Sequence, residues 1–466
     1  MNDSVFIERL HKVCQGGICA GDDIPASYLR DWLGQYHGRA LALARPSCTA
    51  EVAAIVRLCH EAKISMVPQG GNTGYRGGAT PDDSGTAVLL AMERMRAIRA
   101  INPAAGTITV EAGCILEDVQ RAAEENGMFF PLHLGAAGSC QIGGNLATNA
   151  GGVNVLRYGN ARDLCLGVEA VLPSGEIMNL LTGLRKDNTG YDVKNLLIGS
   201  EGTLGVITAA VMRLFPALAS RAAVFAAVPN VRAALELLLL CQQQTDGMME
   251  SFELIPEILL SLLHKHMPHI QQPFASPQLT VLAEAAGGVD IGDRLLAAME
   301  VGLERGLLTD AVAAQSESQR RQFWQLREST PEATKREGGW SKMDVTLPLD
   351  KLADFIDTAE ALVAADVAGQ YIIAFGHLGD GNLHLSLRPN GESPAANPRR
   401  AADLEAKLLD AVKSFGGSFS AEHGIGQSKL AEMRCYKDPV ALGAMRAIKK
   451  ALDPHSIMNP GKMIVW

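Results

Sequence analysis

The segment 376–386, Gly-His-Leu-Gly-Asp-Gly-Asn-Leu-His-Leu-Ser, constrains the fold more than any other part of the chain. It joins two apolar, strand-like runs, and Asp380-Gly381 is typical of a two-residue hairpin turn. A turn there pairs His377 directly with His384, and opposed side chains project from one face about 5 Å apart at Cβ. Two imidazoles at that spacing can chelate one divalent metal. The alternative is a tight hairpin that carries two hydrogen-bonded histidines.

A third candidate ligand lies downstream of the hairpin. Residues 420–426 read Ser-Ala-Glu-His-Gly-Ile-Gly, so a carboxylate, Glu422, stands beside a histidine, His423. Two histidines and one carboxylate form a common catalytic metal set that leaves positions open for a substrate. A solvated carboxylate next to an ordinary turn histidine is the alternative for this pair.

Glycine is abundant, at 47 of 466 residues, and three segments are rich in it: 69–78, 135–152 and 199–205. None of them has the Gly-Lys-Ser/Thr ending of a P-loop, and none opens a helix with Gly-x-Gly-x-x-Gly. They offer backbone N–H groups with little side-chain bulk, which can cradle a pyrophosphate or approach a flat ring closely. Flexible surface turns are the alternative, but each segment adjoins a strand pattern, which favours one long ligand.

Composition argues against several classes of function. The net charge is −9 and no basic run is present, so nucleic acid is not expected as a partner. The nine cysteines form no Cys-x-x-Cys pair, which indicates free thiols in a reducing compartment. The N-terminus lacks the pattern of a signal peptide, and no apolar run approaches the ~18 residues needed to span a bilayer. A cytoplasmic location is therefore predicted.

The length of the chain predicts two or more domains, and the expected fold class is α+β. Residues 1–220 carry the glycine segments among strand and helix patterns. Over residues 221–426, short strands alternate with amphipathic helices and long glycine runs are absent. That texture predicts an antiparallel sheet with helices on one face. Residues 427–466 end in a polar, turn-rich tail that can return to the first domain.

The glycine segments, the hairpin, Glu422-His423-Gly424 and the tail 459–462 (Asn-Pro-Gly-Lys) occur in one order that resembles the FAD-linked oxidases of the vanillyl-alcohol oxidase type. Within them the chain is similar to the D-2-hydroxy-acid dehydrogenases, which include D-2-hydroxyglutarate and D-lactate dehydrogenases and the glycolate oxidase flavin subunit. The resemblance runs from about Arg45 to Met463. It implies a two-lobed FAD-binding domain, an antiparallel-sheet cap domain for the substrate, and a C-terminal segment that returns to the flavin.

By this resemblance, the glycine segments bind FAD. The pyrophosphate is expected on residues 70–74, and the isoalloxazine near residues 138–144 and 147–152. Many relatives attach FAD covalently through a histidine or a cysteine, and segment 69–78 contains neither, so non-covalent FAD is expected. The cofactor-binding residues implied are Gln69, Gly70, Gly71, Asn72, Thr73, Gly74, Gly78, Gly135, Gly138, Ser139, Gly143, Gly144, Asn145, Thr148, Asn149, Gly151, Gly152, Glu201, Gly202, Gly205, Ile207 and Asn459.

The resemblance also implies roles for the hairpin and for the residues after it. His377, His384 and Glu422 would hold one divalent metal, expected to be zinc, with manganese as the alternative. His423 would be the catalytic base. An imidazole suits that role because its ordinary pKa lies near the working pH.

The substrate is expected to bind in the cap domain. The residues that the resemblance assigns to it are Arg327, Thr330, Lys342 and Ser386. Hydroxyglutarate enzymes commonly have asparagine at the position of Ser386 and threonine at the position of Pro331, so this chain departs from their pattern at both. Surface ion pairing is the alternative for Arg327 and Lys342.

These residues favour the oxidation of D-2-hydroxyglutarate to 2-oxoglutarate, because two cations near a metal suit a dicarboxylate. Oxidation of D-lactate or glycolate is the alternative within the same class. A metal-dependent hydrolase and a non-redox FAD-domain transferase are the alternatives from other classes. The expected partners are the small 2-hydroxy acid and a separate electron acceptor, either an electron-transfer flavoprotein or a quinone. A homodimer is compatible with this interpretation.

Overall fold

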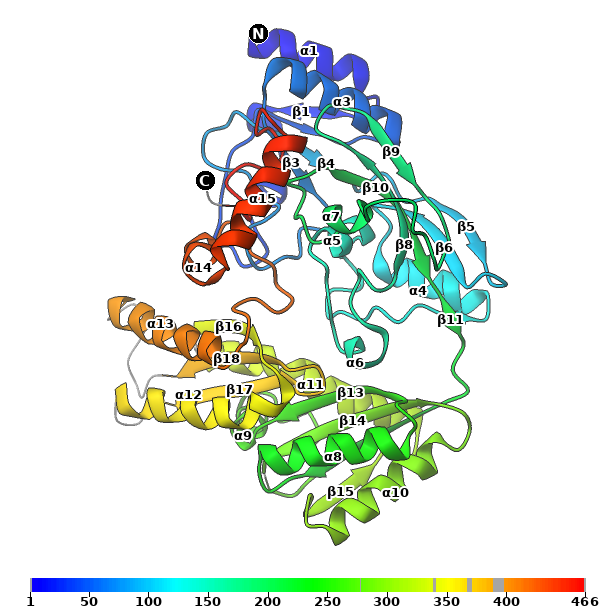
Figure 1. Ribbon diagram of the computed structural model, residues 1–466, viewed down its shortest axis with the longest axis vertical. Coiled ribbons are helices and arrows are strands. Elements are labelled where there is room, and N and C mark those ends of the chain that lie inside the picture. Colours follow the sequence, from blue (N-terminus) through cyan, green and yellow to red (C-terminus); the bar gives the residue numbers. More distant parts are fainter. Residues whose placement is uncertain (1, 277, 338–340, 367–370, 389–397, 465–466) are drawn as a thin grey trace. The chain divides into compact units, whose positions relative to one another are not determined.

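The computed structural model describes residues 2–276, 278–337, 341–366, 371–388 and 398–464. The chain forms two compact units (Figure 1). The first unit comprises Met1–Gly152, Gly159–Ala217 and Glu422–Trp466, and the second comprises Val153–Tyr158 and Leu218–Ala421. Among the described residues, no helix combines the length and the apolar character needed to cross a membrane.

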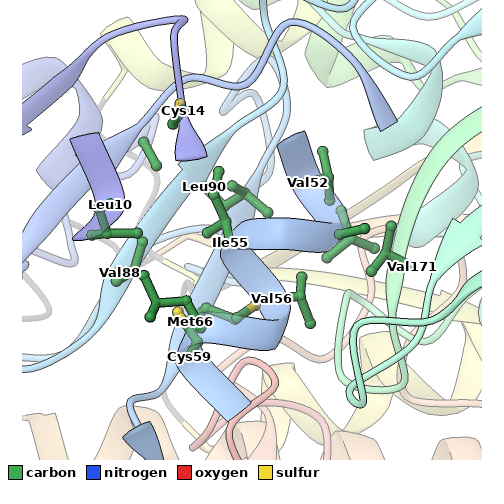
Figure 2. Packing of buried hydrophobic residues seen from close by; sticks show 14 of the residues in the cluster. Leu10, Cys14, Val52, Ile55, Val56, Cys59, Met66, Val88, Leu90 and Val171 are labelled. Atoms are coloured by element: carbon green, nitrogen blue, oxygen red, sulfur yellow. The ribbon is translucent and has the colours of Figure 1, made fainter. Parts of the chain in front are cut away.

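The first lobe of the first unit is built on a four-stranded sheet with the order β1-β2-β4-β3. Its elements are α1 (Asp3–Val13), β1 (Ile18–Ala20), η1 (Gly21–Asp23), α2 (Ala26–Leu29), β2 (Ala42–Ala44), α3 (Thr49–Ala62), β3 (Met66–Gln69) and β4 (Val88–Ala91). Strands β2, β4 and β3 are parallel, and β2 and β4 are buried along their whole length. Apolar residues of α3, among them Val52, Ile55 and Val56, pack into this core (Figure 2).

The second lobe is a five-stranded antiparallel sheet with the order β5-β6-β10-β8-β9. Its elements are β5 (Ile98–Asn102), β6 (Thr107–Glu111), α4 (Leu116–Glu125), β7 (Met128–Phe129), α5 (Ile142–Ala147), β8 (Cys165–Val171), β9 (Ile177–Leu180), α7 (Lys194–Leu197), β10 (Val206–Arg213) and β11 (Phe215–Pro216). Strands β7 and β11 form a separate pair. Val171 at the end of β8 and Val206 at the start of β10 belong to the core of the first lobe, so the two lobes share one core (Figure 2).

The C-terminal segment adds helices α14 (Leu430–Tyr436) and α15 (Pro439–Leu452) to the first unit. Its tail runs beside β3, because the Met66 amide donates to Ile457 O (2.7 Å) and the Asn459 amide donates to Met66 O (2.8 Å). A buried ammonium fixes this tail: Lys449 Nζ donates to Asp453 Oδ2, Thr203 O and Met458 O at 2.5–2.9 Å. The C-terminal tail is therefore an integral part of the first unit.

The second unit is a seven-stranded antiparallel sheet with the order β15-β12-β14-β13-β17-β18-β16. Its elements are α6 (Val155–Tyr158), β12 (Ser220–Ala227), α8 (Val231–Gln244), β13 (Met249–Ile255), α9 (Glu257–His266), β14 (Thr280–Gly287), α10 (Ile291–Glu304), β15 (Asp310–Ala313), α11 (Glu317–Arg336), β16 (Ser341–Thr346), η2 (Leu349–Lys351), α12 (Leu352–Asp366), β17 (Tyr371–His377), β18 (Asn382–Arg388) and α13 (Pro398–Ser414). Together the two units have the α+β architecture expected from the sequence.

Helices cover both faces of this sheet, so the prediction of helices on one face is wrong. Phe225 of β12 packs edge-on against Phe323 of α11, with ring centroids 5.0 Å apart. Ala222 of the same strand lies on the opposite face, and its Cβ is 3.8 Å from where a Cβ on Gly292 of α10 would be. Amphipathic helices that alternate with strands can pack on either face, and their periodicity does not say which.

The segment that contains α6 is an excursion of the chain into the second unit. It leaves the first unit after Gly152 and returns at Gly159. It is held against β13, because Ser251 Oγ donates to Val153 O (2.7 Å) and the Tyr158 hydroxyl donates to Glu250 Oε1 (2.7 Å). A six-residue stretch from the N-terminal half is thus built into the second unit.

The hairpin β17–β18 differs from the prediction in its register. Phe375, and not His377, pairs with His384, and the connection is the four-residue stretch 378–381 instead of a two-residue turn. Gly376 has a φ of +123°, and a Cβ there would come 2.9 Å from His384 Cδ2. The error is two residues, so every side chain keeps its predicted face. The two histidines are diagonal neighbours with ring centroids 5.3 Å apart.

Candidate active site

The first unit contains a cleft whose walls come from all three glycine-rich segments. About 1060 Å³ of space, its open mouth included, is left empty by protein atoms. Pockets of that size take large organic ligands. The sequence-predicted residues that line it are Gln69, Gly70, Gly71, Asn72, Thr73, Gly74, Gly78, Gly143, Gly144, Asn145, Thr148, Glu201, Gly202, Gly205, Ile207 and His423.

Glycine is required where the first two segments meet. A Cβ on Gly71 would lie 2.1 Å from the carbonyl oxygen of Ser139, which no side chain could tolerate. Gly70 and Gly144 also approach each other through their backbones, since a Cβ on Gly70 would lie 3.5 Å from the Cα of Gly144. The two segments therefore meet backbone to backbone, as expected for a wall that approaches a flat cofactor.

The remaining predicted cofactor residues do not belong to the lining of the cleft but support it. Two examples are Asn149, whose Oδ1 accepts from the Arg162 amide (3.0 Å), and Gly152, whose amide donates to Glu422 Oε2 (3.1 Å). Asn459 donates through Nδ2 to Gly78 O (2.9 Å) and Glu201 O (2.7 Å). This supporting set comprises Gly135, Gly138, Ser139, Asn149, Gly151, Gly152 and Asn459.

Strained backbone conformations gather around the cleft. Asn72, Asn149, Glu201 and Asn459 all have positive φ, between 44° and 53°. Residues other than glycine adopt this region rarely, and such residues cluster at ligand sites. Each of these four was predicted from the sequence to contact the cofactor.

Glu201 joins the cleft to the loop that carries His423. Its buried carboxylate accepts hydrogen bonds from the amides of Ile425 and Gly426, each at 2.7 Å. Burial raises the pKa of this carboxyl, and the two amides oppose that shift. The bonds hold the loop against the third glycine segment, so His423 lies on the wall of the cleft. Its ring meets the ring of Tyr75 edge-on, with centroids 4.9 Å apart.

The sequence prediction did not include two long polar side chains of the cleft, Arg76 and Gln141. Gln141 Oε1 is buried and has no hydrogen-bond donor among the described residues. A buried acceptor without a donor is costly, so a ligand N–H is expected to meet it. The N–H of an isoalloxazine ring would satisfy this atom, so the cleft fits FAD. A long polar side chain within a run of small residues was the signal available in the sequence.

The second unit carries a row of four ionisable side chains on one face of its sheet. Glu253, His377, His384 and Asp344 stand on four adjacent strands, β13, β17, β18 and β16. Glu253 pairs with His377, and His384 pairs with Asp344, in the strand register. His384 Nδ1 lies 3.6 Å from Asp344 Oδ1, and the latter accepts from Asn382 Nδ2 (2.9 Å). Two imidazoles thus stand side by side between two carboxylates.

Glu253 binds two of the predicted site residues at once. Its Oε1 lies 2.6 Å from His377 Nδ1, and its Oε2 accepts from Arg327 Nε, also at 2.6 Å. Burial alone would raise the pKa of Glu253, but the charges of His377 and Arg327 lower it to about 2. The carboxylate is therefore ionised at neutral pH. Among the described residues, Arg327 makes hydrogen bonds only through Nε.

Lys342 and Ser386 directly oppose each other on β16 and β18, on the same face as the histidines. The Ser386 hydroxyl is buried and has no hydrogen-bond partner among the described residues. Thr330 has a structural role, because its hydroxyl donates to Arg327 O at 2.9 Å. Pro331 stands inside α11 and cannot make the amide bond that this carbonyl would accept in a regular helix. The Thr330 hydroxyl replaces that bond.

Comparisons with known proteins agree with both sites. Residues 40–181 match the family model "FAD binding domain", and residues 218–463 match "FAD linked oxidases, C-terminal domain". A Bos taurus protein named "D-2-hydroxyglutarate dehydrogenase, mitochondrial" is 40% identical over 439 residues, 93% of this chain and 78% of the relative. A "D-2-hydroxyglutarate dehydrogenase" of Xanthomonas citri pv. viticola is 37% identical over 94% of this chain and 92% of its own length. The structure of p-cresol methylhydroxylase superposes with a TM-score of 0.78 at 16% identity, over 98% of this chain and 96% of that one.

The chain therefore belongs to the FAD-linked oxidases, in the branch that contains the D-2-hydroxyglutarate dehydrogenases. It is an FAD-dependent oxidoreductase with the fold of the vanillyl-alcohol oxidase type, as the resemblance in its sequence implied. This membership argues against the hydrolase and transferase alternatives, neither of which explains a flavin site and a row of ionisable side chains together.

Proposed function

We propose that the protein oxidises D-2-hydroxyglutarate to 2-oxoglutarate, with non-covalently bound FAD and one divalent metal. The observation that carries this proposal is the face of the second unit on which two histidines stand beside two cationic side chains, Arg327 and Lys342. A 2-hydroxy acid can chelate a metal through its hydroxyl and carboxylate, and a second carboxylate needs a cation of its own. The names of the relatives in the same branch agree with this substrate.

The proposed metal ligands are His377, His384 and Glu422, with zinc as the expected ion and manganese as the alternative. Ala421 donates its amide to Asp344 Oδ2 at 3.2 Å, beside His384. Glu422 is the next residue along the chain, and consecutive Cα atoms are about 3.8 Å apart. Covalent continuity therefore supports a shared ligand set. Bound there, a divalent ion would act as a Lewis acid toward the substrate hydroxyl.

The residues of the chain have separate tasks in this proposal. The terminal nitrogens of Arg327 and the ammonium of Lys342 hold carboxylate, and the unpaired hydroxyl of Ser386 can donate a further hydrogen bond. Thr330 supports the helix that presents Arg327, which accounts for a polar residue beside Pro331. His423 takes the proton of the C2 hydroxyl. FAD, held in the cleft of the first unit, supplies the acceptor for the hydride from C2.

An anaerobic screen tests the proposed substrate. The purified yellow protein is mixed with D- and L-2-hydroxyglutarate, D- and L-lactate and glycolate, and loss of flavin absorbance is followed. D-2-Hydroxyglutarate is expected to bleach the flavin fastest, and the L-enantiomers are expected not to. Faster bleaching by D-lactate or glycolate would establish the alternative within the same family. No bleaching by any of these acids would contradict the whole assignment.

Non-covalent FAD is expected to leave the protein on denaturation. The reason is that neither a cysteine nor, apart from His423, a histidine lines the cleft among the described residues. After acid precipitation, the yellow chromophore should appear in the supernatant. Colour retained in the washed pellet would show covalent attachment.

Lys342→Met is expected to change the substrate preference. A charge-assisted hydrogen bond contributes about 2–3 kcal/mol, so kcat/KM on D-2-hydroxyglutarate should fall roughly 30- to 150-fold. D-Lactate has no second carboxylate, and its kcat/KM should change little. Lys351→Met, at an exposed lysine of the same unit, is the control. An equal loss on both substrates would assign Lys342 to the shared carboxylate and favour the monoacid alternative.

The electron acceptor, a cytoplasmic location and a homodimer stay predictions. An electron-transfer flavoprotein or a quinone would reoxidise the flavin in this proposal. The Bos taurus relative is named as mitochondrial, which is a statement about that protein.

A further inference from the structure

Glu253 is a buried carboxylate of the second unit to which no catalytic or binding role has so far been given. It is 1% exposed, stands on β13 and faces the row of ionisable side chains. Each of its two oxygens contacts a different residue of the proposed site, His377 on one side and Arg327 on the other, at 2.6 Å in both cases. Distances this short are typical of charge-assisted hydrogen bonds.

We propose that Glu253 is a positioning residue that orients the metal ligand His377 and the substrate-binding Arg327 through one shared carboxylate. The proposal rests on the proposed function for both partners. Its new element is that the metal site and the carboxylate site are mechanically joined at one side chain.

The contact with His377 selects which ring nitrogen can bind a metal. A proton on Nδ1 that is donated to a carboxylate leaves the lone pair on Nε2. Histidine ligands commonly hold this arrangement, and loss of the carboxylate typically weakens metal binding 10- to 100-fold. The strand register reinforces the contact, because Glu253 and His377 are directly paired between β13 and β17.

The contact with Arg327 fixes the other half of the site. Hydrogen bonding through Nε holds the planar guanidinium in one orientation and leaves its two terminal nitrogens for a ligand carboxylate. Without Glu253, the arginine would lose its only hydrogen-bond acceptor among the described residues. Its aim and its burial would both change, so substrate affinity should fall together with metal affinity.

A second buried glutamate in the same sheet provides a matched control. Glu284 stands on β14, the strand next to β13, and is 4% exposed. It is bound by Arg320 Nη1 and by Trp324 Nε1, each at 2.8 Å, and both donors belong to α11, the helix that carries Arg327. Glu284 contacts no histidine, so Glu284→Gln tests the effect of neutralising a buried carboxylate on the fold alone.

The experiment measures metal binding directly. The FAD-loaded protein is stripped of metal, and its affinity for Zn²⁺ is measured by competition with a chromophoric chelator for wild type, Glu253→Gln, Glu284→Gln and His384→Ala. Glu253→Gln is expected to bind Zn²⁺ about 10- to 100-fold more weakly than wild type. Glu284→Gln is expected to match wild type, and His384→Ala is expected to lose binding altogether.

A second measurement separates the two contacts. Binding of 2-oxoglutarate to the metal-free proteins, followed by its perturbation of the flavin spectrum, reports on Arg327 without the metal. Glu253→Gln should weaken this binding, and Glu284→Gln should leave it unchanged. Unchanged binding of both Zn²⁺ and 2-oxoglutarate in Glu253→Gln would overturn the proposal.

The outcomes distinguish this proposal from the proposed function. If His384→Ala binds Zn²⁺ as tightly as wild type, the metal site itself is wrong. If His384→Ala loses Zn²⁺ while Glu253→Gln keeps it, the metal site stands and the role of Glu253 is overturned. Should Glu253→Gln fail to fold, the double variant Glu253→Met/Arg327→Met removes both charges of the buried pair, a change that proteins commonly tolerate. Weakened Zn²⁺ binding is expected in that variant as well, and wild-type affinity would contradict the proposal.

Discussion

Replacing His384 by alanine is expected to lower the rate of flavin reduction by D-2-hydroxyglutarate about 10³-fold or more, because Lewis-acid assistance is worth several kcal/mol. FAD should remain bound at full occupancy, since the residues that line the cleft belong to the first unit and His384 belongs to the second. Stopped-flow reduction and the flavin-to-protein absorbance ratio measure the two quantities.

His264→Ala is the matched control for this prediction. His264 is an exposed histidine of α9 in the same unit, outside the row of ionisable side chains, so its loss should leave both quantities unchanged. Removing the metal from wild type by chelation should reproduce the His384→Ala phenotype, and adding back Zn²⁺ or Mn²⁺ should restore the wild type only. Full activity in protein shown by elemental analysis to contain no divalent metal would refute a catalytic ion.

His423→Asn is expected to slow flavin reduction by roughly 10²- to 10⁴-fold, the usual contribution of a general base. Asparagine keeps a hydrogen-bonding side chain but cannot take the proton of the C2 hydroxyl. A histidine must be neutral to act as a base, so the wild-type rate should fall as the pH is lowered. That acid limb should be absent from the pH profile of the variant.

The control for this second prediction is His455→Asn. His455 is exposed, lies in the same unit and stacks on His60 with ring centroids 5.0 Å apart. FAD occupancy and Zn²⁺ affinity should match wild type in both variants, which separates loss of a base from loss of the site. A His423→Asn enzyme with wild-type rates would move the role of base to another group.

The hairpin shows what a local pattern can and cannot determine. Alternation placed His377 and His384 on one face correctly, and that conclusion does not change when the register moves by two residues. The turn type was wrong, because Asp380-Gly381 is part of a four-residue connection and not a two-residue turn. A dipeptide preference weighs local backbone geometry only, whereas the actual loop also contacts Phe252 of the neighbouring strand through the amide of Gly379.

Partners that come from distant strands could not be read from the sequence. Glu253 lies 124 positions before His377, and no local motif marks it. Asp344 was visible in the strand that carries Lys342, but its proximity to His384 depends on the pairing of β16 with β18. In the cleft, the glycine segments revealed the walls because close backbone approach requires glycine. The isolated long side chains, Arg76 and Gln141, gave no comparable signal.

The excursion of residues 153–158 into the second unit has a consequence for modular exchange. The second unit is discontinuous in the gene, so a fragment cut at residues 218 and 421 would lack the partner of Glu250 and Ser251 on β13. A recombination that replaced residues 218–421 alone would also separate Tyr158 from the surface it fits. New substrate specificity in this lineage is therefore expected to arise by substitutions within the unit, or by exchange of long stretches that begin before Gly152.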